Sequence, residues 1–244
     1  MLRYEYKYLV PFSQLEDLRE YLSPFVRVDP YSPETEKNLY TVRSIYFDTS
    51  DLKYYLEKVE GLIRRKKIRL RGYNELDDAS NLFFEIKRKH QSGIHKSRVK
   101  LDFETAKKIV SSPNFSPEKF RNRNSSLNGE IDKFYYYIIR ERLRPELLVV
   151  YEREAYYDKF NFATRMTFDL NLRSAPYQNF ENMFCEKHLL HSYSDHFIFE
   201  VKIYRGIPLW IKQCIAKFNL THRALSKYVI SWDTQKENSL QARI

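Results

Sequence analysis

Charged and bulky apolar residues alternate in several segments of this chain. In residues 3–8 three charged side chains alternate with three tyrosines, and the same period of two recurs in residues 68–71 and 84–87. A period of two places the charged side chains on one face of a β-strand and the apolar side chains on the other. Because Tyr, Ile, Leu and Phe occupy the apolar positions, the pattern predicts a sheet with one core-forming face and one charged face.

Strand-like patterns cover most of the chain. They lie at approximately 3–10, 41–48, 66–73, 82–90, 95–101, 147–158, 163–171 and 196–204, and helical spacing occurs at 13–22, 51–61, 103–110, 126–144 and 209–218. Residues 111–125 and 173–195 are predicted to be loops because Asn, Ser and Pro interrupt them. About eight strands can close into a barrel with a narrow interior. The expected fold class is therefore α+β: a closed eight-stranded antiparallel β-barrel with helices packed on its outside.

Several helix ends can be predicted from single residues. Ser13 and Glu16 have the spacing of a capping box, and Gly61 should end the helix that begins near Asp51. Pro145 should end the longest helix, and the last predicted helix begins after Pro208. No segment is typical of a linker, so we expect a single domain over residues 1–244, with a core from about 3 to 230 and a C-terminal tail from about 231 to 244.

Composition narrows the choice of partner and compartment. The chain has 42 Lys and Arg against 32 Asp and Glu, a net charge of +10 and a pI of about 9.4, which favours an anionic partner such as nucleic acid, a phosphorylated molecule or a membrane surface. Cys185 and Cys214 are too few for a disulfide framework and lack metal-site spacing, so a cytoplasmic location is expected. No stretch approaches the roughly 18 apolar residues of a membrane helix; docking to a membrane protein is compatible with this.

If the predicted sheet closes, the charged faces of all strands converge on its interior. The side chains concerned are Arg3, Glu5, Lys7, Lys67, Arg69, Arg71, Glu85, Lys87, Lys89, Lys96, Arg98, Lys100, Arg153, Arg165, Asp169, Glu200 and Lys202. Burying so many cations together is unfavourable unless an anion neutralises them. A mixed lining of Arg and Lys suits a chain of phosphoryl groups. The few acids, Glu5, Glu85, Asp169 and Glu200, are candidate ligands for a divalent metal ion that bridges phosphate oxygens.

A series of short motifs supports this interpretation from residue 3 to residue 228. They read Arg3-Tyr-Glu5-Tyr-Lys7-Tyr8, Arg43-Ser-Ile-Tyr-Phe-Asp48-Thr, Ile68-Arg69-Leu-Arg71-Gly-Tyr73, Phe84-Glu85-Ile-Lys87-Arg-Lys89, Lys96-Ser-Arg98-Val-Lys100, Val150-Tyr-Glu-Arg153, Arg165-Met-Thr-Phe-Asp169, Phe199-Glu200-Val-Lys202 and Ser226-Lys227-Tyr228. In this order they resemble the VTC domain of vacuolar transporter chaperone polyphosphate polymerases, within the triphosphate tunnel metalloenzyme superfamily that also includes the CYTH triphosphatases.

The resemblance implies an activity and a set of site residues. It implies a metal-dependent polyphosphate polymerase that transfers the γ-phosphate of ATP to a growing inorganic polyphosphate chain inside a basic tunnel, with Mn²⁺ or Mg²⁺ as cofactor. The implied catalytic residues are Arg69, Arg71, Lys87, Arg153 and Arg165, and the implied substrate-binding residues are Arg3, Lys7, Lys100, Lys202, Ser226 and Lys227. Glu200 matches the metal-binding glutamate of the family, and Glu5 is the second metal candidate. The expected partners are ATP and inorganic polyphosphate.

One departure separates two branches of the resemblance. Hydrolytic relatives typically open with Glu-x-Glu-x-Lys, whereas this chain has Arg3 at the first of these positions. A cation there favours a polymerase that binds a long polyanion. The alternatives are a tunnel-type inorganic or nucleoside triphosphatase and a non-catalytic polyphosphate-binding domain. The chain is expected to be a stand-alone catalytic domain.

Structural roles compete with functional ones at some of these positions. Glu5, Glu85 and Glu200 could only balance neighbouring cations, and Asp48 is expected to cap the following turn or helix rather than bind metal. Residues 226–228 could be part of a helix end or could close the tunnel. Because tyrosines and cations alternate onto opposite faces, a nucleic-acid partner is not expected.

Overall fold

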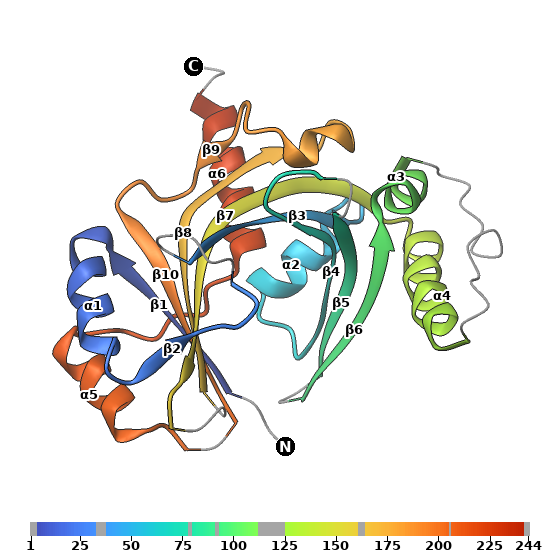
Figure 1. The fold of residues 1–244 in the computed structure, drawn as a ribbon. Helices are drawn as coiled ribbons and strands as arrows, with labels where there is room; N and C mark the ends of the chain where they lie inside the picture. Colours follow the sequence, from blue (N-terminus) through green and yellow to red (C-terminus); the bar gives the residue numbers. More distant parts are fainter. Residues whose placement is uncertain are drawn as a thin grey trace.

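The computed structural model describes residues 4–32, 38–77, 80–90, 93–111, 125–160, 164–204 and 206–241. Within these residues ten strands form one antiparallel sheet (Figure 1). The strands are β1 (Tyr4–Pro11), β2 (Val26–Val28), β3 (Leu39–Asp48), β4 (Arg64–Tyr73), β5 (Asn81–His90), β6 (Gly93–Asp102), β7 (Arg144–Asp158), β8 (Thr164–Pro176), β9 (Leu190–His191) and β10 (His196–Ile203). Their order is β1-β10-β8-β7-β3-β4-β5-β6, with β2 paired to β7 and β9 paired to β8.

The predicted closed barrel is wrong. The sheet curves strongly in Figure 1, but in the part of the chain that the structure describes it begins at β1 and ends at β6, and no pairing joins these two edges. The reason lies at β1, whose outer edge is already occupied. The backbone N–H of Arg223 donates to the carbonyl of Lys7 at 2.8 Å, and Tyr8 forms a bridge with His222. A returning segment therefore protects the edge that barrel closure would need.

All eight predicted strand segments are strands. The predicted number is nevertheless too low, because β2 has three residues and β9 has two, and a period of two cannot be recognised in so few positions. The predicted loop at 173–195 is partly structured as well. β8 continues to Pro176, and the 3₁₀ helix η3 (Glu181–Phe184) and β9 follow. Residues 112–124 of the other predicted loop lie outside the described residues.

The predicted helices are present with shifted ends. They are η1 (Phe12–Gln14), α1 (Leu15–Leu22), α2 (Lys53–Val59), α3 (Phe103–Ser111), α4 (Ser125–Arg140) and α5 (Leu209–Lys217). The capping box at Ser13 is not formed, since the side chain at the N-cap of α1, Gln14, makes no capping hydrogen bond and Ser13 lies in the 3₁₀ turn. α4 ends before Pro145 because Arg142 has a positive φ of 51° and reverses the chain.

A sixth helix was missed. α6 (Lys227–Gln241) contains the residues predicted to be a C-terminal tail. Ser231 and Gln235 are buried within it, and the Gln235 amide donates to the carbonyl of Ser174 in β8 at 2.8 Å. The polar sequence of this helix gives it a weak apolar stripe, so its helical spacing is hard to recognise.

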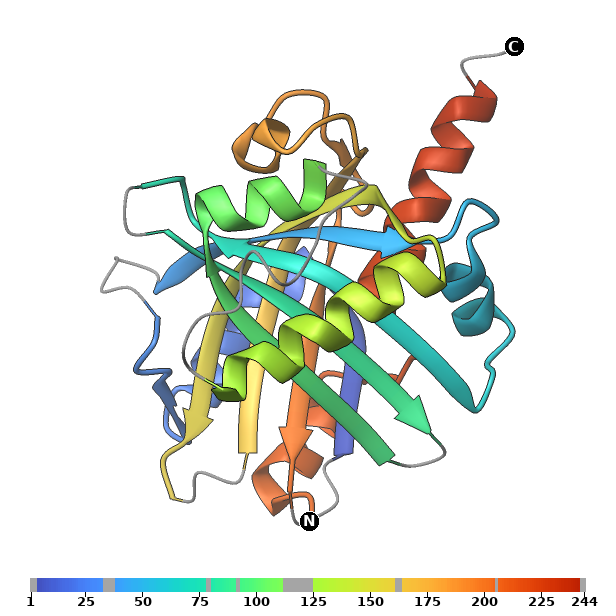
Figure 2. The same ribbon diagram turned by 90° about the vertical axis from the view of Figure 1, so that its right-hand side faces the viewer.

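Helices cover both faces of the sheet. On the outer face α3 and α4 lie across β5 and β6 (Figure 2), where Ile68, Leu70 and Phe84 are buried. α1 and α5 cover the outer face at the other end of the strand order. On the inner face α6 packs against β7 and β8. The helices on the outer face bury the apolar positions of the strands, which leaves the charged positions on the inner face.

A β-bulge changes the alternation in β8. Asn171 has a φ of 50°, and the pairing of β7 with β8 shifts register between Val150 and Glu152. The extra residue reverses which side chains face inward. Leu172 therefore packs in the inner cluster with α6, whereas a strict period of two from Asp169 would have placed Asn171 there.

Candidate functional site: a charged cluster on the inner face

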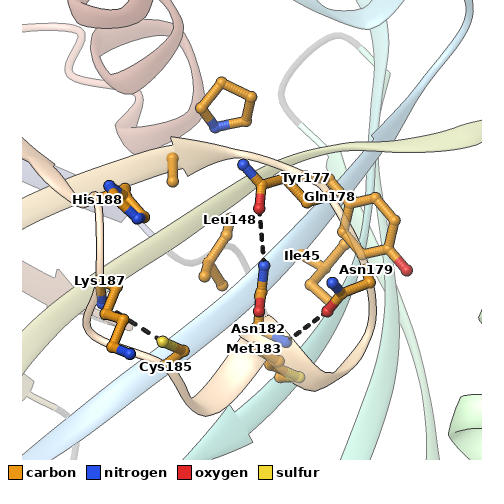
Figure 3. Close-up of a pocket in the computed structure, with 12 residues that line it drawn as sticks. Ile45, Leu148, Tyr177, Gln178, Asn179, Asn182, Met183, Cys185, Lys187 and His188 are labelled. Atoms are coloured by element: carbon orange, nitrogen blue, oxygen red, sulfur yellow. Dashed lines mark hydrogen bonds between the residues drawn. The ribbon is translucent and has the colours of Figure 1, made fainter.

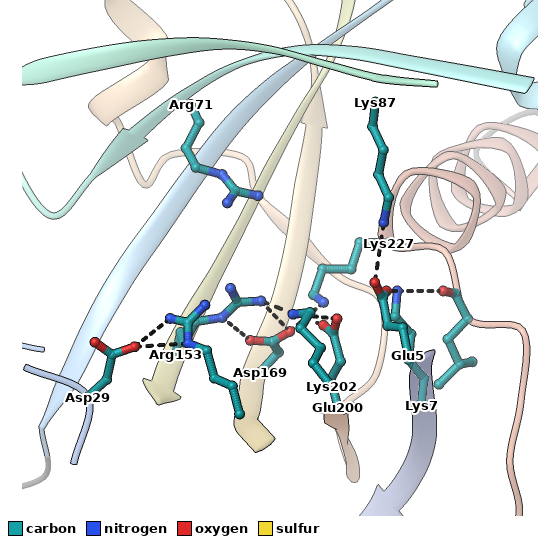
Figure 4. Close-up of polar contacts among 12 residues, drawn as sticks. Glu5, Lys7, Asp29, Arg71, Lys87, Arg153, Asp169, Glu200, Lys202 and Lys227 are labelled. Atoms are coloured by element: carbon teal, nitrogen blue, oxygen red, sulfur yellow. Dashed lines mark hydrogen bonds and ion pairs between the residues drawn. The ribbon is translucent and has the colours of Figure 1, made fainter. Parts of the chain in front are cut away.

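The inner face gathers the charged positions of seven strands. Cross-strand partners include Lys7 with Glu200 and Glu5 with Lys202, and Arg153 with Asp169. These residues and those of β4 to β6 form what is called here the charged cluster: Glu5, Lys7, Lys67, Arg69, Arg71, Glu85, Lys87, Lys96, Arg98, Arg153, Asp169, Glu200, Lys202 and Lys227. Two walls of the curved sheet contribute to it: one consists of β4, β5 and β6, and the other of β1, β10, β8 and β7. Figure 4 shows Arg71 and Lys87 pointing from the first wall toward residues of the second.

Asp169 is the centre of the first group of ion pairs. Its two carboxylate oxygens accept from Nε and Nη2 of Arg153 at 2.6 and 2.8 Å, and Lys227 Nζ lies 2.5 Å from Oδ2 (Figure 4). All three side chains are buried. Burial alone would raise the pKa of Asp169, but Arg153 and Lys227 lower it to about 2. The bidentate geometry fixes the Arg153 guanidinium in one orientation.

Glu5 and Glu200 alternate with lysines on β1 and β10. Lys202 Nζ lies 2.5 Å from a carboxylate oxygen of Glu200. Lys7 lies 2.9 Å from Glu5, and the other Glu5 oxygen lies 3.3 Å from Lys87 on β5. The Glu5–Lys87 pair thus connects β1 and β5 by side chains, whereas no backbone pairing joins these two strands in the described part of the chain.

Burial and charge move the pKa values of this second group in opposite directions. Burial alone would raise the pKa of Glu200, but the ammonium groups of Lys202 and Lys7 hold it well below its usual range. Burial lowers the pKa of Lys202 to about 7, although Glu200 opposes the shift. Glu200 therefore stays ionised, and Lys202 binds its proton weakly for a lysine.

Glu85 is the centre of a third group on β4, β5 and β6. Nε and Nη2 of Arg69 donate to one carboxylate oxygen at 2.8 and 2.7 Å, with Arg71 3.8 Å away. Lys96 and Arg98 lie 2.9 and 3.5 Å from the other oxygen. Burial would raise the pKa of Glu85, but Arg69 and Arg71 outweigh it and hold the pKa well below its usual range. One carboxylate thus serves four cations, which leaves positive charge available to a ligand.

Tyrosines such as Tyr46 and Tyr151 lie on the charged face, contrary to the prediction. Tyr46 OH accepts from Nη1 of Arg69 at 3.0 Å, and the Arg153 guanidinium lies 5.2 Å from the centre of the Tyr151 ring. The phase of the strand contained this signal, since Tyr151 lies two residues before Arg153. Tyr8 follows the prediction that tyrosines face away from the charges, because it is buried on the outer face.

Asp48 has a capping role, as predicted. Its Oδ1 accepts from the backbone N–H groups of Thr49 and Tyr54 at 2.8 and 2.9 Å, and its Oδ2 accepts from the N–H of Tyr55 at 3.0 Å and from Tyr228 OH at 2.7 Å. A carboxylate with four donors is satisfied without a metal ion. Asp48 therefore joins the start of α2 to the start of α6.

Ser226 precedes α6 and faces β4. Its hydroxyl oxygen accepts from the backbone N–H of Val229 at 3.4 Å, as an N-cap residue does, and from Lys67 Nζ at 2.6 Å. Residues 226–228 are thus the first turn of a helix that lies against the inner face. Lys67, which the resemblance does not place in the site, is brought to it by this contact.

The other predicted site residues lie farther from these groups. Arg165 forms an ion pair with Asp29 at 2.7 Å, beyond the end of β2. Lys100 is exposed on the edge strand β6. Arg3 lies outside the described residues. The charged cluster therefore brings together Lys7, Arg69, Arg71, Lys87, Arg153, Lys202, Ser226, Lys227, Glu5 and Glu200.

Among the described residues no group of three or more His, Cys, Asp or Glu side chains is arranged to hold a metal ion. Glu200 and Glu5 each face a lysine instead. Mg²⁺ is commonly bound by one or two carboxylates together with phosphate oxygens and water. The buried, ionised Glu200 fits that donor set, so a metal ion fits here in company with a phosphate ligand rather than in a cage made by the protein alone.

Two cavities lie away from the inner face. One, of about 180 Å³, is lined by residues that include Ile45, Asn179 and Asn182, and the N–H of Asn182 donates to Asn179 at 3.0 Å (Figure 3). The other, of about 530 Å³, lies between α2, β4 and α4, and its Lys66 and Glu141 form an ion pair at 2.5 Å. Neither cavity gathers ionised groups from several strands as the charged cluster does.

No helix among the described residues is both long and apolar enough to cross a membrane.

A sequence model of the family described as the VTC domain matches residues 2–235. Vacuolar transporter chaperone complex subunit 4 of Schizosaccharomyces pombe is 26% identical over 182 residues, which are 68% of this chain and 25% of that protein. The chain thus spans about a quarter of the length of this relative.

Solved structures give weaker likenesses. PH1819 from Pyrococcus horikoshii has a TM-score of 0.48 at 11% identity, covering 94% of this chain and 99% of its own. The putative adenylyl cyclase HpAC1 from Hippeastrum, whose title reports a dominant triphosphatase activity, has a TM-score of 0.49 at 11% identity, covering 96% of both chains. At these values neither likeness decides the fold or the activity.

Proposed function

The chain belongs to the VTC domain family, and from this premise we propose that it is a metal-dependent polyphosphate polymerase. In this proposal it transfers the γ-phosphate of ATP to the end of an inorganic polyphosphate chain. The observation that carries the proposal is the charged cluster, in which single carboxylates such as Asp169 and Glu85 are shared by several cations. Such a face is stabilised by a polyanion, which supplies the missing negative charge.

The protein side chains have distinct tasks in this reaction. Arg69 and Arg71 on one wall and Arg153 on the other hold the charge that develops on the transferred phosphoryl group. Asp169 orients the guanidinium group of Arg153 through two hydrogen bonds, and Glu85 orients that of Arg69 in the same way. Because phosphoryl transfer depends mainly on positioning and charge neutralisation, no side-chain nucleophile is required.

The basic residues around this centre bind the rest of the substrate. Lys7, Lys87 and Lys202 face the interior between β1, β10 and β5, and Ser226 and Lys227 contribute from α6. Glu200 and Glu5 are the proposed protein ligands of a Mn²⁺ or Mg²⁺ ion. Such an ion, when bound, neutralises phosphate oxygens. Lys100 and Arg165 are proposed to guide the polyanion outside the cluster, and Arg3 is proposed to bind it, as the family resemblance implies.

The length of the basic surface supports a polymer rather than a single triphosphate. Cations continue from Arg153 on β7 through β4 to Lys96 on β6, over most of the strand order. We propose that the 244-residue chain is one catalytic domain, acting in the cytoplasm on ATP and polyphosphate. Since the S. pombe relative is named as a complex subunit, docking to a membrane protein is part of the proposal.

Product analysis tests the activity. Incubation with ATP and Mn²⁺ should give ADP and a ladder of phosphate chains on a gel. Release of inorganic phosphate without a ladder would show a triphosphatase instead. Tight polyphosphate binding without turnover in any divalent metal would show a binding domain.

A further inference from the structure

Three lysines form a row across the charged face. Lys67 on β4 is the cross-strand partner of Lys87 on β5, and Lys87 is the partner of Lys96 on β6. Like charges directly opposite each other destabilise a sheet. Two of the three have a carboxylate nearby: Lys87 lies 3.3 Å from Glu5, and Lys96 lies 2.9 Å from Glu85.

Lys67 differs from its two neighbours. Its amine donates to the Ser226 hydroxyl at 2.6 Å, and within the described residues it has no ion pair with a carboxylate. The charged groups that act most strongly on it are cations: Lys7 from β1, Lys87 from β5, Arg69 from β4 and Lys58 from α2. Burial, followed by repulsion from these cations, holds the pKa of Lys67 well below its usual range.

The partner of Lys67 belongs to a helix start. Ser226 caps α6, a helix of 15 residues. The first N–H groups of a helix carry partial positive charge, which favours an anion at this end. Lys67 thus presents a half-buried amine that faces several cations and is hydrogen-bonded to a hydroxyl at a helix N-terminus. This arrangement favours a negative ligand.

We propose that Lys67 and Ser226 form a phosphoryl-binding subsite that takes up a proton when the anion binds. Without a ligand, desolvation and the neighbouring cations disfavour the charged form of the Lys67 amine. A bound phosphoryl oxygen supplies the negative charge that stabilises the ammonium form, and the proton comes from the buffer acid, which is left as its conjugate base. The choice of a phosphate chain as the ligand rests on the proposed function.

Titration calorimetry with inorganic tripolyphosphate tests the subsite without any turnover. At pH 8 the heat is measured in two buffers of different ionisation enthalpy, which gives the number of protons taken up. The wild-type protein should take up protons. Lys67→Met should lower the affinity about 10- to 100-fold, because a hydrogen bond to a charged group is lost.

Lys67→Arg separates charge from protonation. A guanidinium is always protonated, so this variant should bind tripolyphosphate within a few-fold of wild type while taking up fewer protons. The difference between wild type and Lys67→Arg isolates Lys67 from Lys202, whose pKa is also low. Lys212→Met, on the exposed side of α5, is the control for loss of one positive charge and should match wild type in both measurements.

The possible failures are distinguishable. Wild-type affinity in Lys67→Met, or an unchanged proton count in Lys67→Arg, would overturn the subsite and leave the polymerase proposal intact. Loss of affinity in Lys67→Met in a protein that makes no polyphosphate from ATP would retain the subsite and overturn the polymerase. A wild-type protein that does not bind tripolyphosphate would overturn both.

Discussion

The Tyr228 hydroxyl donates a hydrogen bond of 2.7 Å to Oδ2 of Asp48. The Tyr228 ring also stacks on Tyr46, with ring centres 4.9 Å apart, and Tyr46 in turn accepts from Arg69. Tyr228 of α6 is thereby connected through Tyr46 to Arg69 on β4, which is proposed to bind phosphate. The position of α6 and the orientation of Arg69 are therefore coupled.

Tyr228→Phe should destabilise the protein while leaving the ring stack in place. It removes a buried hydrogen bond to a charged acceptor, which is worth about 1.5–3 kcal/mol. The midpoint of urea unfolding should fall accordingly without a change in slope. Tyr31→Phe, at a position 93% exposed, is the matched control, and equal midpoints for the two variants would contradict the role of this hydrogen bond.

Asp169 should make the protein acid-sensitive. Its pKa is lowered from 3.8 to about 2 in the folded state, so the folded state holds fewer protons than the unfolded state between these values. Its stabilising contribution is complete above pH 4 and is lost as the pH falls through 2. Asp169→Asn should cost about 3–5 kcal/mol at pH 7, because Arg153 and Lys227 lose their buried counter-charge.

The difference in unfolding free energy between wild type and Asp169→Asn should also depend on pH. The gap in unfolding free energy between wild type and Asp169→Asn should narrow from pH 4 to pH 2, measured by urea titration at each pH. A constant gap across this range would show that Asp169 is not the ionised partner of Arg153.

Lys67→Met should raise the melting temperature of the ligand-free protein. Because the pKa of Lys67 is lowered below 10.5 in the folded state, the unfolded state binds more protons in the pH range between the lowered pKa and 10.5, and wild-type stability should rise with pH through that range. Removing the amine removes this penalty and flattens the slope. Calorimetric scans from pH 7 to pH 10 measure both effects, and a variant that melts below wild type at every pH would refute the argument.

Glu200→Ala should separate turnover from binding. Loss of the proposed metal ligand should abolish metal-dependent formation of ADP from ATP, while tripolyphosphate binding is retained because Lys202 and Arg153 lose a competing carboxylate. Glu237→Ala, exposed on α6, should keep full activity. Unchanged turnover in Glu200→Ala would remove its assigned role.

The period of two was sufficient to predict which side chains share a face. It placed Arg69 and Glu85 on one side and Ile68 and Phe84 on the other, and the structure has this arrangement. The pattern depends on side-chain direction within a strand, which is a local property. Whether the two edges of a sheet meet depends on segments that are distant in the chain, such as the one that brings Arg223 to Lys7. A local sequence pattern does not contain this information.

The parts of the site that were missed depend on irregular or distant geometry. The bulge at Asn171 reverses the phase of β8, which allows Leu172 and Ser174 to face α6. The position of Lys67 on the charged face was predicted, but its contact with Ser226 exists only because α6 brings that residue to it. A residue that meets its partner 159 positions away in the chain cannot be identified from spacing.

The lack of pairing between β1 and β6 in the described residues has a consequence for a long ligand. A closed ring of strands would have to be threaded by the end of a polymer, whereas an arch can release a chain sideways. Glu5 on β1 and Lys87 on β5 form a partly buried ion pair, and a polyanion competes directly for that lysine. Under the proposed function, an internal stretch of polyphosphate could therefore enter from the side, so that binding would not require a free chain end.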